Sequence, residues 1–249
     1  MREVRGSNPM TNPRSFVALA SSDVQERMTV RGAIIKTAVL LLLLIAAAVF
    51  TWTWAIMSGS VASISLLLWV GILGGFGMAM VTIFKKEWAM YTAPFYAVLE
   101  GFALGGISLM LSGGYGWLPL QAAMFSVGVL MVMLFTYLMG WIKVTDRLRS
   151  MIIAATGAVA LVYLATMVLQ LFGLNVPFMY DKSWYGILIN LVVIGIAAFN
   201  LLLDFNVIET GAQVGAPKYM EWYGAFGLLL TLVWLYLEIL RLMSRLNRR

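Results

Sequence analysis

The chain has 249 residues, and its content of 62% hydrophobic and 11% charged residues indicates a membrane protein, because soluble domains carry about 25% charged residues. The net charge of +6 comes from Lys and Arg in tails and short loops, which is typical of topology signals and anionic-lipid contacts rather than of nucleic-acid binding. The absence of Cys and His excludes disulfides, haem and iron–sulfur thiolate sites, His-ligated zinc and nucleophilic catalysis by Cys or by a Ser–His pair.

The first 30 residues differ in character from the rest of the chain. Residues 1–30 carry two Asn-Pro pairs together with Ser, Arg and Gly, with little hydrophobic periodicity, and we expect them to form a flexible polar tail. The apolar run that follows, Ala33 to Ile56, is too long for a signal-peptide core of roughly 7–15 residues. It therefore predicts a retained membrane anchor.

Seven apolar stretches, each close to the roughly 20 residues that cross the hydrocarbon core, divide the rest of the chain. The connections between them are short and rich in Gly, Ser or charged residues, which leaves no room for a soluble domain. The sequence thus predicts an all-α integral membrane protein in which residues 31–249 form a single domain of seven transmembrane helices. The helices are expected at residues 33–56, 61–84, 90–112, 118–142, 151–173, 184–208 and 220–243.

Two GxxxG pairs occur within these runs, Gly71 with Gly75 and Gly101 with Gly105. Small residues at this spacing let helix backbones approach closely in lipid. The pairs predict where helices pack and indicate no chemistry.

The positive charges near the helix ends set the expected orientation. With the N-terminus in the cytoplasm, twelve Lys and Arg residues fall on the inner side and five on the outer side. The C-terminal arginines are among the five, so either the last helix crosses despite them or the final segment re-enters and leaves the tail inside. We expect a multi-pass protein with a cytoplasmic N-terminus, and a last helix that crosses because Met220 to Met243 is long enough.

Asp204 stands four residues inside the end of the sixth run, where an ionisable side chain is costly and marks a functional site by default. The other sides of this helix carry Leu, Ile, Val and Phe, so the acid is expected to point into protein or water. The alternative is a lone acid that reaches the nearby interface. Helical spacing puts small and polar residues on the face of Asp204, namely Gly186, Asn190, Ala197 and Asn200.

Three further acids lie within apolar runs. Glu100 lies near the middle of the third run, where desolvation favours its uncharged form. Glu221, at the start of the last run, is either an interfacial anchor or a functional acid, and Glu238 is expected to form a local ion pair with Arg241 near the outer surface. No Lys or Arg lies deep enough to neutralise Glu100 or Asp204. Two such carboxyls can share a proton, bind a cation or line a wet cavity; alternatively, each is protonated and hydrogen-bonded between helices.

Several functional classes do not fit these residues. A retinal protein would need a Schiff-base lysine in the last helix, and a serine intramembrane protease would need a base for Ser108, which no histidine supplies. An aspartyl protease needs two carboxylates that share a proton, and Glu100 and Asp204 are expected at different depths. A small-molecule exporter is disfavoured because no inverted repeat or broken helix is evident. We therefore expect no enzymatic activity and no cofactor.

The third run carries the sequence YAVLEGFALG from Tyr96 to Gly105, which resembles the third-helix signature of the YccA-like bacterial branch of the Bax inhibitor-1 family. The resemblance extends from about Met28 to the C-terminus. Four further segments resemble the same group: AATG at 154–157, LDF at 203–205, GAPKYMEWY at 215–223 and WLYLEILRL at 234–242.

This resemblance implies six helices around a central hydrophobic one, a pH-sensitive calcium or cation leak and, in some members, a role in restraining cell death or a membrane-bound protease. In the calcium-leak members, an aspartate pair between the sixth and seventh helices senses protonation and gates the pore. Asp204 occupies the first of these positions, and Thr231 stands at the second. Leu111 stands where the family has an arginine, and Glu100 matches an acidic position of the pore helix.

Together these features predict a protein of the bacterial inner (plasma) membrane that leaks Ca²⁺ or cations generally, with the lipid bilayer and these cations as partners. The alternative is a non-conducting regulator of a membrane-bound protease or of a stress or cell-death complex, which would bind that partner through its basic N-terminal tail. Asp204 and Glu100 are the expected contacts for a transient Ca²⁺. The predicted cation-binding and pH-sensing residues are Asp204, Glu100, Thr231 and Asn200, with Glu221, Glu238 and Asn190 as secondary candidates.

Overall fold

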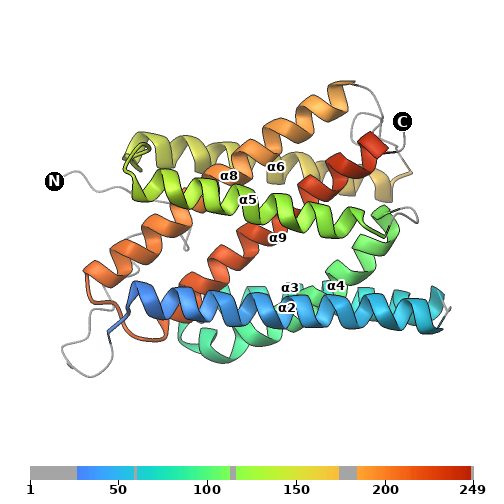
Figure 1. The fold of residues 1–249 in the computed structure, drawn as a ribbon, viewed down its shortest axis with the longest axis horizontal. Coiled ribbons are helices and arrows are strands. Elements are labelled where there is room, and N and C mark those ends of the chain that lie inside the picture. The colour runs from blue at the N-terminus through green and yellow to red at the C-terminus, as the bar shows by residue number, and fades with distance from the viewer. Residues whose placement is uncertain (1–26, 59–60, 113–115, 174–183, 248–249) are drawn as a thin grey trace. The chain divides into compact units, whose positions relative to one another are not determined.

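The computed structural model describes residues 27–58, 61–112, 116–173 and 184–247 (Figure 1). Seven helices in this part of the chain are long and apolar enough to cross a membrane, which confirms the predicted all-α fold with seven transmembrane helices. A short 3₁₀ helix, η1 (Lys86–Trp88), joins the second of them to the third. The seven are α2 (Val30–Ser58), α3 (Val61–Phe84), α4 (Ala89–Ser112), α5 (Leu118–Leu138), α6 (Asp146–Leu171), α8 (Trp184–Gln213) and α9 (Met220–Asn247).

Local capping signals, rather than hydrophobicity, set the start of α6 and the end of α5. Helix α6 begins at Asp146 instead of the predicted residue 151, because the Thr145 side chain accepts a hydrogen bond from the backbone N–H of Leu148 at 3.3 Å. Helix α5 ends at Leu138 instead of residue 142, shortly before Gly140, whose φ of +67° suits glycine and is typical just after a helix. Most of the predicted tail, residues 1–26, lies outside the described residues.

The contacts between residues divide the chain into two compact units. Unit 1 comprises residues 1–114 and 204–230, and unit 2 comprises residues 115–203 and 231–249. Helices α8 and α9 are therefore each divided between the two units, whereas each of the other helices belongs to one unit only. The expected single domain, with six helices around a central one, stays a prediction.

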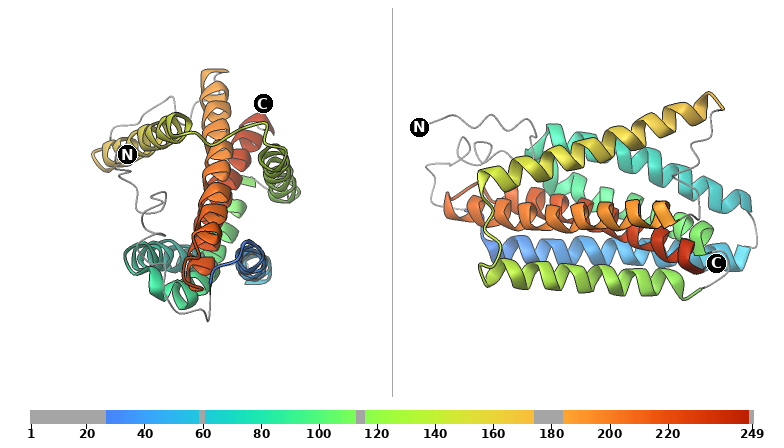
Figure 2. Two further views of the ribbon diagram at one scale, coloured as in Figure 1. Left: turned by 90° about the vertical axis from the view of Figure 1, so that its left-hand side faces the viewer. Right: turned by 90° about the horizontal axis from the view of Figure 1, so that it is seen from above.

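Within unit 1, α4 packs against both α2 and α3, and α2 and α4 run side by side (Figures 1 and 2). Glycines allow this close approach. A Cβ at Gly105 would lie 2.7 Å from the carbonyl oxygen of Ala48 in α2, and a Cβ at Gly71 would lie 2.5 Å from the backbone nitrogen of Ala103 in α4. The GxxxG residues thus mark helix contacts as predicted, since close packing replaces the hydrophobic drive within lipid.

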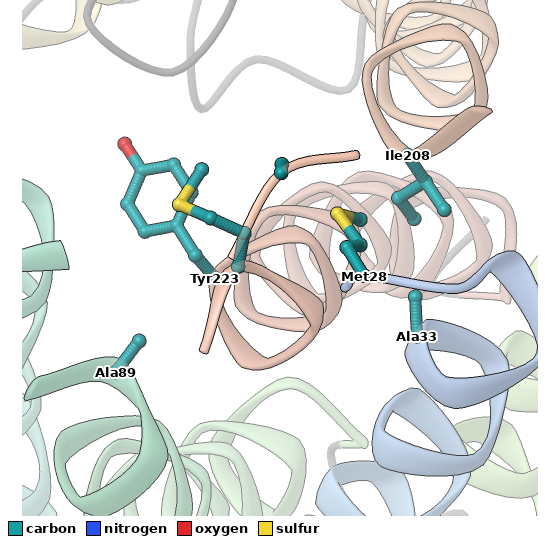
Figure 3. Close-up of a cluster of buried hydrophobic side chains, with 7 residues drawn as sticks. Met28, Ala33, Ala89, Ile208 and Tyr223 are labelled. Atoms are coloured by element: carbon teal, nitrogen blue, oxygen red, sulfur yellow. The ribbon is translucent and has the colours of Figure 1, made fainter. Parts of the chain in front are cut away.

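At one end of unit 1, a buried cluster joins segments that are far apart in the sequence (Figure 3). The backbone just before α2 pairs with the loop between α8 and α9, because the N–H of Met28 donates to the carbonyl of Ala216 at 2.6 Å. The starts of α2, α4 and α9 and the end of α8 therefore meet at this end. The cluster comprises Met28, Ala33, Ala89, Ile208, Ala216, Met220 and Tyr223.

Candidate functional site

Glu100 lies near the middle of α4, half-buried beside α3. A Cβ built on Gly75 of α3 would be only 3.1 Å from its Oε2 atom, so the glycine leaves room for the carboxyl. The Tyr96 hydroxyl, one turn earlier, hydrogen-bonds this carboxyl, and the Tyr96 ring packs edge-on against Phe226 of α9 with the ring centroids 5.0 Å apart. None of the described Lys and Arg side chains forms an ion pair with Glu100. Its immediate surroundings are a phenol and small residues.

Asp204 lies on α8, where that helix enters unit 1, so it belongs to the same unit as Glu100. The residue is half-buried, and its Oδ2 atom is shielded from solvent. Its neighbours Leu203 and Phe205 are buried. At least one oxygen of this carboxyl is therefore turned into the protein, as the sequence predicted.

The two asparagines on the predicted Asp204 face bond to other helices. Asn200 donates from Nδ2 to the Thr156 hydroxyl of α6 at 2.7 Å and to its own helix at Ile196 O. Asn190 is buried and donates to Glu238 of α9. Both asparagines belong to unit 2, where they link α8 to α6 and to α9.

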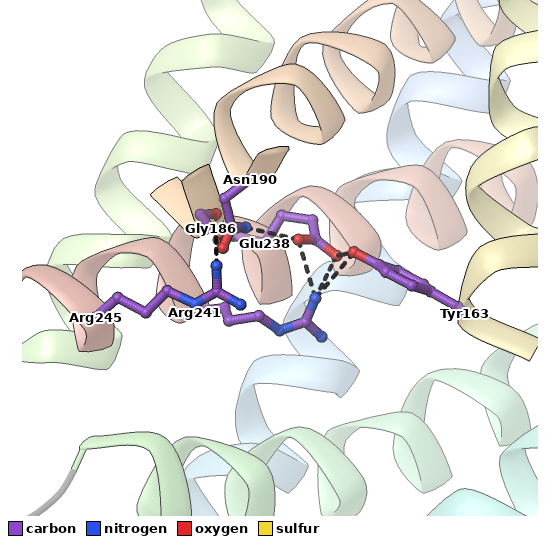
Figure 4. A network of polar contacts seen from close by, with 6 residues as sticks. All are labelled: Tyr163, Gly186, Asn190, Glu238, Arg241 and Arg245. Carbon is purple, nitrogen blue, oxygen red and sulfur yellow. Dashed lines mark hydrogen bonds and ion pairs between the residues drawn. The ribbon is translucent and has the colours of Figure 1, made fainter. Parts of the chain in front are cut away.

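Glu238 sits in a polar network within unit 2 (Figure 4). Arg241 donates to its Oε1 at 2.8 Å, which confirms the predicted ion pair. The expectation of a merely local pair near the surface is wrong, because Glu238 is only 1% exposed and also accepts from Tyr163 of α6 at 2.7 Å and from Asn190 of α8 at 2.8 Å. Three helices thus share one neutralised carboxylate.

Glu221 sits in a second polar cluster, within unit 1, at the first turn of α9. It is 1% exposed and accepts from the backbone N–H of Thr29 at 2.8 Å and from the Thr29 hydroxyl at 2.9 Å. It also pairs with the ammonium groups of Lys36 and Lys218. Because Thr29 precedes the first residue of α2, the carboxylate lies at the positive end of that helix dipole. Glu221 is therefore a buried staple between α9 and α2.

The Lys36–Glu221 pair was not predicted from the sequence, since 185 residues separate its members. One signal could have suggested it: Lys36 is a basic residue inside the first apolar run, and Glu221 is an acid at the start of the last one. Both were expected at the same side of the membrane. A buried charge is costly without a partner of opposite sign, and a partner at the same depth can meet it.

Thr231, the residue at the second sensor position, lies half-buried on α9 in unit 2. Leu111 is half-buried near the end of α4 in unit 1. Among the described residues, no three acidic side chains gather into a metal-binding group. A pairing of Thr231 with Asp204 stays a prediction.

A family model described as Bax inhibitor 1 like matches residues 8–248, nearly the whole chain. The matched region contains all five segments on which the resemblance rests. No curated protein and no solved structure matches the chain.

Proposed function

Since the chain belongs to the Bax inhibitor 1 like family, we propose that this membrane protein is a pH-sensitive leak pathway for Ca²⁺ or for cations generally. The observation that carries the proposal is Glu100, an acid in the middle of a membrane-spanning helix to which no described Lys or Arg is paired. Acids at such depth are costly and are retained mainly where ions or protons pass. The proposal assigns the chain no enzymatic activity and no cofactor.

Asp204 and Glu100 have distinct roles in this proposal. Asp204, near the end of α8, attracts the cation at the cytoplasmic mouth, and Glu100 is the deeper acid. Protonation removes the negative charge that a cation would meet. It shifts a closed–open equilibrium by no more than the difference in proton affinity between the two states.

The other two acids serve stability in this account. Glu221 is compensated by Lys36 and Lys218, and Glu238 by Arg241, so neither offers an uncompensated charge to a passing cation. A buried carboxylate that keeps its cationic partner holds helices together, and it is costly to separate from that partner.

Calcium flux into proteoliposomes at several pH values tests the proposal for the wild type, Glu100→Gln and Asp204→Asn. Glu87→Gln is the matched control, because Glu87 is an exposed acid in the same unit and lies in η1, before α4 begins. We expect both intramembrane substitutions to change the flux and the control to leave it unchanged. A calcium flux that neither substitution changes would contradict the leak proposal.

We also place the protein in the inner membrane of a bacterium, in the YccA-like branch, with its N-terminus in the cytoplasm. In support of this orientation, the basic residues of the α3–α4 and α8–α9 connections lie at the same end of unit 1 as the start of α2. Basic ends are retained on the cytoplasmic side. A tag at the N-terminus should react only with a reagent applied to the cytoplasmic face.

A non-conducting regulator is the second candidate, favoured by the way the chain is anchored just after its tail. Met28 is buried, and Thr29 is held by Glu221, so a partner that pulled on the tail would act directly on the junction of α2 and α9. Deletion of residues 1–26 spares these contacts. Loss of a co-purifying membrane protease from this variant, with flux absent before and after deletion, would favour the regulator.

A further inference from the structure

Lysines lie over aromatic rings at the end of unit 1 where the loops meet. One lysine comes from the first turns of α2, and two come from the connection between α3 and α4. The rings that they face belong to η1 and α9. Each ammonium lies within the range of a cation–π contact. The pairs are Lys85 with Trp88 at 4.5 Å from the ring centroid, Lys86 with Tyr223 at 5.3 Å, and Lys36 with Trp222 at 5.4 Å.

The charge that this end presents outward is mainly positive. Arg27, Arg31 and Lys85 are exposed, and Lys218 is 43% exposed. Glu221, which pairs with Lys218, is hidden beneath it at 1% exposure. Of the described acids near this surface, Glu87 is the exposed one. The pKa of Tyr219, just before α9, is raised first by burial of its hydroxyl and second by the negative charge of Glu87. Cations therefore outnumber exposed acids.

Large apolar side chains continue directly from these charges along α3 and α4. Phe84, the last residue of α3, is 79% exposed, and Trp88 and Tyr91 are 51% and 64% exposed. Aromatic rings of this kind are typical of the boundary between headgroups and acyl chains. A partner that fits both the exposed positive charges and the adjoining aromatic side chains carries a negative headgroup and an apolar body in one molecule.

We propose that this surface, which we call the basic–aromatic end, binds the headgroups of anionic phospholipids. The cations hold the phosphate, Trp88 and Tyr91 lie at the glycerol level, and the exposed faces of α3 and α4 contact the acyl chains. A free anion would use only the charges, and a nucleic acid would gain nothing from rings that face lipid. The binding is independent of ion flux and does not rest on the leak proposal. The basic–aromatic end comprises Arg27, Arg31, Lys85, Lys86, Trp88 and Lys218.

The test compares two triple variants that remove equal charge. The first is Arg31→Gln/Lys85→Gln/Lys86→Gln, at the basic–aromatic end. The second is Lys143→Gln/Arg147→Gln/Arg149→Gln, in the connection between α5 and α6 and in the first turn of α6. The two sets match in exposure, since each has two exposed members and one half-buried member.

The full-length protein is reconstituted in bilayers with spin-labelled phosphatidylglycerol or phosphatidylcholine, and the fraction of motionally restricted label is measured. The wild type should prefer phosphatidylglycerol. The variant at the basic–aromatic end should lower this preference at least about fivefold, because that is the contribution of a single basic residue near an anionic surface and the variant removes several. The second variant should stay close to the wild type. Equal loss in both variants, or no preference in the wild type, would overturn the proposal.

Two further measurements separate the alternatives. Lys85→Arg/Lys86→Arg keeps the charge and should keep the preference, so a loss in this variant would count against charge recognition. Added inorganic phosphate, compared with sodium chloride of the same ionic strength, should not displace the labelled lipid. Displacement by phosphate alone would identify a free-anion site instead of a lipid site.

Discussion

At the scale of single residues, the buried carboxylates fall into two kinds. Glu221 and Glu238 each have a cationic partner, whereas no described basic side chain pairs with Glu100. This difference decides which acids stabilise the protein and which are candidates to meet an ion. Burial raises the cost of charge for all of them, and only a partner offsets it.

Gly32 is the residue that makes room for the Glu221 carboxyl. A Cβ on Gly32 would overlap that carboxyl, which cannot move without breaking its bonds to Thr29 and Lys36. Gly32→Ala should therefore destabilise the protein by about 1–3 kcal/mol, the usual cost of overpacking. Thermal unfolding in detergent measures this loss. Gly77→Ala is the matched control, because a Cβ at Gly77 meets nothing within 4 Å; an equal loss in both variants would contradict the role assigned to Gly32.

Arg241 is the cation that neutralises Glu238. Arg241→Met leaves a carboxylate that is 1% exposed without its charge partner, and we expect a loss of about 3 kcal/mol in unfolding free energy. The double variant Glu238→Gln/Arg241→Met should recover much of this loss, because no unpaired charge is left. Denaturant unfolding in mixed micelles checks both values. If the double variant is as unstable as Arg241→Met, the charge is not the cause.

At the scale of elements, α4 is the helix on which unit 1 is built, since it packs against both α2 and α3. Gly105 of α4 is where its backbone approaches α2, with Ala48 O and Thr51 Cβ both 2.7 Å from an added Cβ. Neighbouring backbone cannot yield as a flexible side chain can. The α2–α4 contact is therefore intolerant of any larger residue.

Gly105→Leu should lower the midpoint of thermal aggregation markedly and separate α2 from α4. Gly157→Leu on α6, where an added Cβ meets nothing within 4 Å, should leave the midpoint nearly unchanged. The chain contains no Cys, so introduced cysteines at Phe50 and Phe102, whose ring centroids lie 6.1 Å apart, can report the α2–α4 distance by cross-linking. Unchanged cross-linking and stability in Gly105→Leu would show that this contact is not tight.

The elements were predictable from the sequence because runs of about 20 apolar residues have few alternatives. Their ends were less predictable: α6 begins at its Thr145 cap, and α8 continues to Gln213, beyond its apolar run. The acids Glu100, Glu221 and Glu238 were also visible as charges within apolar runs. Their partners were not, because Lys36 with Glu221, and Tyr163 and Asn190 with Glu238, meet only through tertiary packing.

At the scale of the whole molecule, the chain is a seven-span membrane protein of the Bax inhibitor 1 like family, with two compact units that share α8 and α9. Unit 1 contains both acids of the proposed leak, Glu100 and Asp204, together with the Glu221 staple and the basic–aromatic end. Unit 2 contains the neutralised Glu238 network. Protonation and ion contact are thus assigned to unit 1.

In the proposed leak pathway Glu100 meets the permeating cation, and the pH profile of calcium flux through Glu100→Gln proteoliposomes measures this role. Because Gln imitates the protonated acid, the variant should hold its flux near the level that the wild type reaches when its acids are protonated, with a weaker response to pH. Glu87→Gln should follow the wild type throughout. A Glu100→Gln profile that coincides with the wild-type profile at every pH would contradict the role proposed for Glu100.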